Sequence, residues 1–181
     1  YKRQPAGFLT VAAFDDEGNR LPDGETGVLY FLRRDGMPEY VGDADQTAAN
    51  RLPGGWFTVG DVGHVDADGY VYLSDRKVDM VITGGANVYP AEVERLMLAH
   101  PEVGQVAVVG IPDDRLGEVG MAFVVPAPGT HPDPAGIVSW CRDEMANYKA
   151  PRRVEVIDVL PLNASGKVLK VELRQRAAGA I

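Results

Sequence analysis

The stretch Val103-Gly-Gln-Val-Ala-Val-Val-Gly-Ile111 decides the fold class of this chain, together with the run Val119–Val125. Both are rich in β-branched residues, and the loop Pro112–Gly117 between them contains proline, aspartates and glycine, so the pattern predicts two strands. Segments of helical character lie on both sides, and a third strand-like run follows. These segments are the helices Pro90–Ala99, Asp133–Asn147 and Val168–Ala178 and the strand Arg153–Val159. This order predicts an α+β fold, with a small mixed α/β domain of roughly 100 residues.

The preceding part of the chain has a different pattern. The first 75 residues predict all-β structure, with strand-like runs at Gly7–Phe14 and Gly27–Leu32. A hairpin is expected at Val62–Leu73, because Asp66-Ala-Asp-Gly69 has the composition of a turn. These strands are too few for a large independent domain, so we expect a partial β-rich unit followed by a domain boundary near residue 76.

Composition limits the classes of function. The chain has 181 residues and a formal net charge of −8, which argues against general nucleic-acid binding. Within 149–176 basic residues exceed acidic ones, a balance that suits either a small polyanion or a solvated charged face. The single cysteine, Cys141, excludes an internal disulfide and favours a cytoplasmic location. The chain opens at Tyr1 without a leader or a membrane-length apolar run, so we expect a piece of a longer protein with no transmembrane segment.

Two charged residues near the expected boundary suit a nucleotide. Asp61 follows Gly60, and an ionised carboxylate can accept hydrogen bonds from the vicinal hydroxyls of a ribose. Arg76 lies in the run Asp75-Arg-Lys-Val-Asp79, and a guanidinium can hold phosphate or carboxylate oxygens.

Two glycine-containing turns follow in the second domain. Gly84 and Gly85 precede the helix expected at Pro90, where a loop without side chains can offer N–H groups to an anion or let a thin chain pass. Lys167 ends the turn that begins at Pro161, and its ammonium group can neutralise negative charge developing in a transition state.

Each feature alone has an ordinary structural alternative. A Gly-Asp pair is usually a turn, a glycine pair before a helix is usually a tight turn, and a loop lysine is usually solvated. The glycine loop lacks the Walker and dinucleotide-binding spacings. The three histidines show no metal-ligand spacing and no Ser-His-Asp arrangement, so no metal site is predicted in this chain.

Taken in this order, the motifs resemble the C-terminal third of the adenylate-forming superfamily, which contains acyl-CoA synthetases, peptide-synthetase adenylation domains and luciferases. The string Gly60–Asp79 resembles the family's ribose-binding motif followed by its interdomain linker. The string Ile82–Glu94 is similar to the form found in fatty and aryl acid–CoA ligases. The resemblance runs across nearly the whole chain and is most specific between Gly55 and Lys170.

The resemblance implies a role for each candidate residue. Asp61 would hold the ribose of ATP or AMP, and Arg76 would contact the nucleotide. Lys167 would bridge the reacting carboxylate and the α-phosphate during adenylation. Gly84 and Gly85 would line the tunnel for the pantetheine of coenzyme A. In this family the C-terminal domain swings between two poses, so that one small lid serves both half-reactions.

The resemblance also implies a division of the chain. Residues 1–75 would be the last β-subdomain of the family's large N-terminal domain, and residues 76–181 the C-terminal lid, with a hinge at about 76–79. The family's hinge position, commonly aspartate or lysine, is Val78 here, so either the pivot lacks a polar anchor or Lys77 or Asp79 supplies one. The phosphate loop, the acyl pocket and the magnesium-binding glutamate have no counterpart in this chain, so Mg²⁺ is expected through the N-terminal domain.

From the resemblance we expect the parent protein to be an AMP-forming acid–CoA ligase, with a fatty acid as its substrate. ATP and coenzyme A would be the other substrates, the N-terminal domain would be the partner, and the isolated piece would be inactive. A lysine acetyltransferase and a deacetylase acting on Lys167 would be further partners. Two alternatives stay open: a non-catalytic module that binds nucleotide or coenzyme A, and an acyl-AMP ligase that passes its product to a carrier protein.

Overall fold

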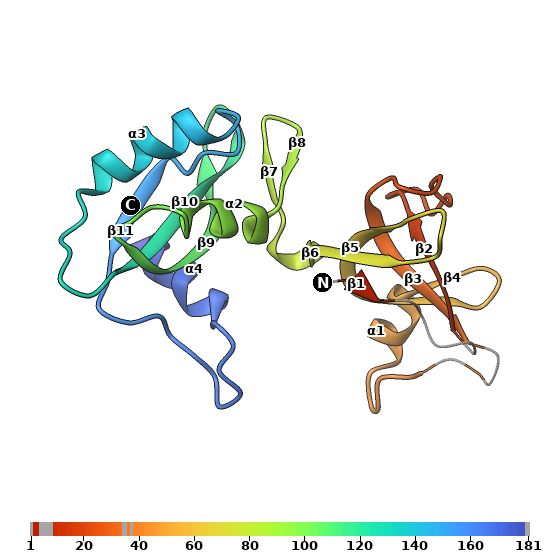
Figure 1. The fold of residues 1–181 in the computed structure, drawn as a ribbon. Coiled ribbons are helices and arrows are strands. Elements are labelled where there is room, and N and C mark those ends of the chain that lie inside the picture. The colour runs from red at the N-terminus through yellow and green to blue at the C-terminus, as the bar shows by residue number, and fades with distance from the viewer. Residues whose placement is uncertain (1, 4–8, 34–35, 37, 180–181) are drawn as a thin grey trace. The chain divides into compact units, whose positions relative to one another are not determined.

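The chain forms two compact units, Tyr1–Val78 and Asp79–Ile181 (Figure 1). A computed structural model describes residues 2–3, 9–33, 36 and 38–179. The first two residues of the strand expected at Gly7–Phe14 therefore lie outside the described residues. None of the described helices is both long and apolar enough to cross a membrane.

The first unit is built on an antiparallel sheet. The strands are β1 (Lys2–Arg3), β2 (Leu9–Phe14), β3 (Gly27–Arg33), β4 (Arg51–Leu52), β5 (Trp56–Val65) and β6 (Val71–Arg76). They pair in the order β1-β6-β5-β3-β2, and β4 pairs with β5. Val11, Ala13 and Leu29 form the small buried core of this unit. The hairpin expected at Val62–Leu73 is present, because β5 and β6 pair antiparallel.

The all-β prediction for the first 75 residues is wrong in one segment. Helix α1 (Ala44–Ala49) begins after Asp43, whose Oδ1 accepts a hydrogen bond from the N–H of Gln46 at 2.9 Å. An aspartate N-cap followed by alanines favours a helix locally, and the helix contains no buried residue. Local capping and propensity therefore decide this element rather than packing.

The second unit alternates strands and helices. The 3₁₀ turn η1 (Lys77–Asp79) leads into the hairpin β7 (Val81–Thr83) and β8 (Ala86–Val88). The remaining elements are α2 (Pro90–Met97), β9 (Val103–Asp113), β10 (Gly117–Pro126), α3 (Pro134–Glu144), β11 (Arg153–Val156) and α4 (Lys170–Gly179). β10 pairs antiparallel with β9 and β7, and parallel with β11.

Side chains of the central strands alternate between two cores. On one face Val108 and Val124 pack with α2 and α3, whose residues in this cluster are Val93, Met97, Ile137 and Cys141. On the other face Val109 and Phe123 pack with Leu173 and Ala177 of α4. The sheet therefore lies between α2 and α3 on one side and α4 on the other, which confirms the predicted α+β class.

Four expected elements are shorter in the structure. The helix expected at Pro90–Ala99 ends at Met97, and the strand expected at Arg153–Val159 ends at Val156. The other two are helices limited by a neighbouring residue. The helix expected to reach Asn147 ends at Glu144, because Met145 is extended with φ −144°. The last helix starts at Lys170 rather than Val168, because Val168 forms an antiparallel bridge with Leu162 that closes the preceding turn. In both cases a residue takes extended backbone geometry and limits the helix.

Candidate functional site

Asp61 and Arg76 lie opposite each other on adjacent strands of the first unit. They are register partners of β5 and β6, and the Nε of Arg76 lies 3.6 Å from Oδ1 of Asp61. The Arg76 side chain is 61% exposed, whereas that of Asp61 is 26% exposed. Next to them Gly60 has φ +82° and open space where a Cβ would lie. A half-buried carboxylate beside an exposed guanidinium can accept hydroxyl hydrogen bonds and attract a phosphate from one strand pair.

Gly84 and Gly85 form the two-residue turn of the β7–β8 hairpin. The flanking residues Thr83 and Ala86 pair with each other, and both glycines have positive φ, +58° and +83°. Positive φ at both central positions is the geometry of a type I′ hairpin turn, which glycine adopts most easily. The N–H of Gly84 donates to the carbonyl of Leu116 at 2.8 Å, and both glycines are exposed. The turn therefore exposes backbone without side chains, and its position is held by the hydrogen bond to Leu116.

Lys167 lies at the end of an exposed turn that Asn163 holds closed. The Asn163 side-chain oxygen accepts from the N–H of Lys167 at 2.9 Å and from the N–H and hydroxyl of Ser165 at 3.0 and 2.8 Å. The Asn163 N–H donates to the Lys167 carbonyl at 2.8 Å, and Gly166 has φ +78°. Within the described part of the chain, the Lys167 ammonium group has no hydrogen bond or ion pair. The backbone is held while the charged end of the side chain stays in solvent.

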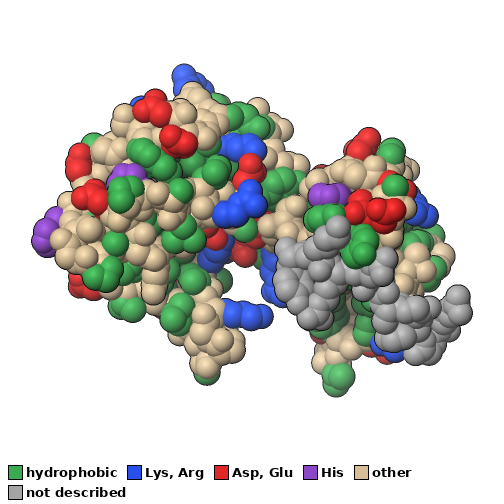
Figure 2. Space-filling model, in the orientation of Figure 1, with side chains coloured by type: hydrophobic (Ala, Val, Ile, Leu, Met, Phe, Trp, Pro, Cys, Tyr) green, Lys and Arg blue, Asp and Glu red, His purple; other side chains and the backbone are tan. Residues whose placement is uncertain are grey.

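The other basic residues near the C-terminus are mostly paired. Ion pairs join Lys149 to Glu92 at 2.7 Å, Lys170 to Glu94 at 2.9 Å, Arg174 to Asp79 at 2.6 Å and Arg176 to Glu155 at 2.6 Å. The Glu92 carboxylate raises the pKa of Lys149 through this hydrogen bond, against the effect of burial. Figure 2 shows side chains of both signs interspersed over the face drawn. The basic excess at 149–176 is therefore largely neutralised by nearby carboxylates. Lys167 differs from these paired residues because its ammonium group has no such partner among the described residues.

The segment expected to be the hinge is the 3₁₀ turn η1. Lys77 pairs with Asp16 at 2.7 Å inside the first unit, and Asp79 pairs with Arg174 inside the second. Between them Val78 is 74% exposed, and the boundary of the two compact units falls after it. Both polar neighbours of Val78 thus have anchors of their own.

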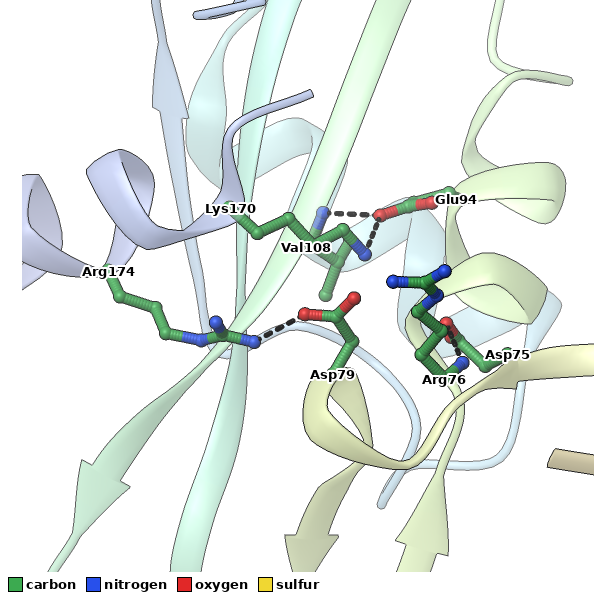
Figure 3. A network of polar contacts seen from close by, with 7 residues as sticks. All are labelled: Asp75, Arg76, Asp79, Glu94, Val108, Lys170 and Arg174. Carbon is green, nitrogen blue, oxygen red and sulfur yellow. Dashed lines mark hydrogen bonds and ion pairs between the residues drawn. The ribbon is translucent and has the colours of Figure 1, made fainter. Parts of the chain in front are cut away.

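The sequence patterns do not predict the polar network around α4. Figure 3 shows Lys170 and the N–H of Val108 both directed at Glu94, and Arg174 directed at Asp79. These partners lie on elements far apart in the chain, and local spacing carries no information about such pairs. Lys170 and Arg174 are four residues apart, so the sequence indicates that both lie on one face of the helix, but it does not indicate their partners.

Neither a reactive thiol nor a metal site is found among the described residues. Cys141 is buried, and burial raises the pKa of its thiol to about 11, so no reactive thiolate forms near neutral pH. Among the described residues no three His, Cys, Asp or Glu side chains gather closely enough to hold a metal ion.

Comparison with known proteins identifies the family. Residues 92–167 match the family model of the AMP-binding enzyme C-terminal domain. The chain is 46% identical over 165 residues to a fatty acid–[acyl-carrier-protein] ligase, ScoC, of Streptomyces coeruleorubidus, a match covering 91% of this chain and 32% of that protein. It is 45% identical over 172 residues to a feruloyl-CoA synthase of an Amycolatopsis species, covering 95% of this chain and 35% of that protein.

A solved structure has a similar fold. The crystal structure of ATP-bound MatB from Rhodopseudomonas palustris matches with a TM-score of 0.88 and 33% identity, over 96% of this chain and 35% of that one. The chain spans about a third of the length of the relatives it matches. On these matches the chain belongs to the adenylate-forming superfamily of AMP-binding enzymes, whose C-terminal domain it carries.

Proposed function

We propose that this chain is the C-terminal part of an AMP-forming acid–CoA ligase. Such an enzyme joins a carboxylic acid to ATP, giving acyl-AMP and pyrophosphate, and then exchanges AMP for coenzyme A. The observation that carries the proposal is the exposed, unpaired ammonium group of Lys167 on a closed turn, among neighbours that are already neutralised. A free cation on a rigid backbone can meet the negative charge that develops where carboxylate and α-phosphate join.

The other candidate residues have complementary roles in this proposal. Asp61 would accept from the ribose hydroxyls and Arg76 would contact the nucleotide, which agrees with their pairing and exposure on β5 and β6. Gly84 and Gly85 would line the path of the pantetheine arm, because a Cβ at Gly85 would project into open space that the arm could use. Mg²⁺ would be held by the N-terminal domain.

The division of labour between the two units is also part of the proposal. Residues 1–75 would belong to the larger N-terminal domain, and residues 76–181 would be the lid that pivots at about 76–79. An exposed Val78 flanked by the anchored Lys77 and Asp79 suits a short pivot, since only its backbone must change conformation. Because its ammonium group is exposed, Lys167 is also open to acetylation in the cytoplasm, which would remove the charge.

The experiment separates the two half-reactions in the full-length enzyme. Acid-dependent pyrophosphate release is measured with a broad panel of acids, and thioester formation is measured from preformed acyl-AMP. We expect Lys167→Ala to lower adenylation at least about 100-fold and to leave the thioester step within about 2-fold. Equal loss of both half-reactions, or no pyrophosphate release from the unmodified enzyme with any acid, would refute the proposal.

A second candidate follows from the relatives. The similarity to ScoC, whose name describes transfer of a fatty acid to an acyl-carrier protein, favours an acyl-AMP ligase that passes its product to a carrier. The similarity to the feruloyl-CoA synthase favours coenzyme A as acceptor and an aryl acid as substrate. Supplying preformed acyl-AMP with either coenzyme A or a carrier protein bearing phosphopantetheine distinguishes the acceptors. The acid panel distinguishes the proposed fatty acid from an aryl acid.

A further inference from the structure

The position of Lys167 depends on the base of its turn. The turn is closed internally by Asn163, and residues 162–167 are exposed. At the base, the Leu169 N–H donates to the Pro161 carbonyl at 2.8 Å, and α4 begins one residue later. Leu160 and Val168, on either side of the turn, pack in the core that α4 also covers. The direction in which the turn projects therefore depends on this packing and on the contacts that hold the first residues of α4.

A largely buried ion pair holds the first residue of α4. Lys170 lies 2.9 Å from Oε1 of Glu94, and the two side chains are only 16% and 21% exposed. The same oxygen accepts from the N–H of Val108 at 2.8 Å (Figure 3). One carboxylate of α2 thus binds both the strand β9 and the start of α4. Charge-assisted hydrogen bonds are directional, whereas the apolar packing of Leu173 against the sheet is not.

A second contact holds the same helix one turn further along. Arg174 lies 2.6 Å from Asp79, the last residue of η1. Residues four apart on a helix lie on the same face, so Lys170 and Arg174 form two points along one line of α4. These two directional contacts act together with the buried packing of Leu173 and Ala177 to fix the tilt of the helix.

We propose that Glu94 and Lys170 are positioning residues for Lys167. Their ion pair orients the start of α4, and through it the ammonium group three residues earlier, for adenylation. The proposal rests on the proposed function, because it assumes that Lys167 acts in that half-reaction. The thioester half-reaction does not depend on this ion pair, because the Gly84–Gly85 turn is anchored separately to Leu116.

The test compares two glutamates of the same helix in the full-length enzyme. Glu94→Gln removes the charge that attracts Lys170 but keeps an oxygen for the N–H of Val108. Glu92→Gln is the matched control, since it removes one ion pair of similar length, to Lys149, that has no link to the Lys167 turn. Adenylation kinetics, the thioester step from acyl-AMP and the melting temperature are measured for both variants.

We expect Glu94→Gln to lower the kcat of adenylation about 10-fold, because sub-ångström to 1 Å displacements of a catalytic group cost rates of this order and more. The KM for ATP and the thioester rate should stay within about 2-fold of the unmodified enzyme, and Glu92→Gln should leave all three unchanged. The double variant Glu94→Gln/Lys170→Met should be no slower than Glu94→Gln, because both changes remove the same interaction.

Three results would overturn the proposal. The first is adenylation that is equally fast in Glu94→Gln and Glu92→Gln, and the second is equal loss of both half-reactions in Glu94→Gln. The third is a double variant in which adenylation is clearly slower than in Glu94→Gln. These failures differ from failure of the proposed function, in which Lys167→Ala itself would leave adenylation intact.

Discussion

Glycine has two different purposes in the first unit. At Gly63 a Cβ would overlap the carbonyl oxygen of Tyr72 on the neighbouring strand, so the close approach of β5 and β6 requires the missing side chain. At Gly69 nothing lies within 4 Å, and only φ +79° favours glycine. The first position is limited by space and the second by backbone conformation.

These two glycines give a paired prediction. Gly63→Ala should lower the free energy of unfolding by about 3 kcal/mol, because a backbone oxygen cannot move aside without disrupting the strand pair. Gly69→Ala should lower it by about 1 kcal/mol, the cost of placing a Cβ in the left-handed region. Urea unfolding of both variants measures the difference. Equal effects would show that the β5–β6 approach is not limiting.

The thiol of Cys141 gives a prediction at alkaline pH. Burial raises its pKa from 9.0 to about 11, so the folded state holds the proton more tightly than the unfolded state. The contribution to stability is complete below pH 9 and is lost between pH 9 and 11, an effect of about 2 kcal/mol. Cys141→Ala should therefore flatten the fall in unfolding free energy over that interval. Parallel pH profiles for the two proteins would contradict this.

At the scale of the element, the N-cap residue Asp133 shows how the start of helix α3 is fixed. Asp133 accepts hydrogen bonds from the N–H groups of Ala135 and Gly136 at 3.3 and 3.0 Å, and Pro134 occupies the first turn. A proline there costs nothing because its missing N–H would have no partner in the helix. The helix buries Ile137 and Cys141 against the sheet, so its beginning affects the core.

Loss of this cap should be measurable. Asp133→Ala should lower the free energy of unfolding by about 1 kcal/mol, because two N–H groups lose their acceptor. Asp143→Ala, an exposed change in the last turn of the same helix, should have an effect within about 0.5 kcal/mol. Chemical denaturation of both variants provides the comparison, and a larger effect at Asp143 would argue against the cap.

At the scale of the whole molecule, the cores are separate. The two clusters that hold the second unit together consist only of residues between Val81 and Ala177. The cluster of the first unit consists of residues in β2 and β3 with partly buried neighbours up to Val71. Each unit therefore has its own source of stability.

This separation predicts that residues 79–181 fold alone. The segment should show native circular dichroism and one cooperative thermal transition, because both faces of its sheet are covered by its own helices. Differential scanning calorimetry of the isolated segment measures this directly. A gradual, non-cooperative transition would show that the first unit is needed for its stability.

Most elements of the second unit could be predicted from local patterns. The alternation of β-branched residues over Val103–Ile111 and the helical spacing after Pro90 both reflect faces that must be buried. The exposed Lys167 turn and the Gly84–Gly85 turn were also expected as turns, because glycine and small residues favour them. The β7–β8 hairpin was expected only as a loop, since its strands of three residues are too short to show alternation.

The amino-acid sequence by itself determined the α+β class, the positions of the turns and the family motifs, because these depend on residues close together in the chain. Only the tertiary structure decided that Glu94 holds Lys170, that Asp79 holds Arg174 and that Lys167 has no partner among the residues the structure describes. Asp79 and Arg174 are 95 residues apart, and only the packing of η1, α2 and α4 around one sheet sets which charges meet. Pairing over such separations depends on how layers stack, which no local spacing encodes.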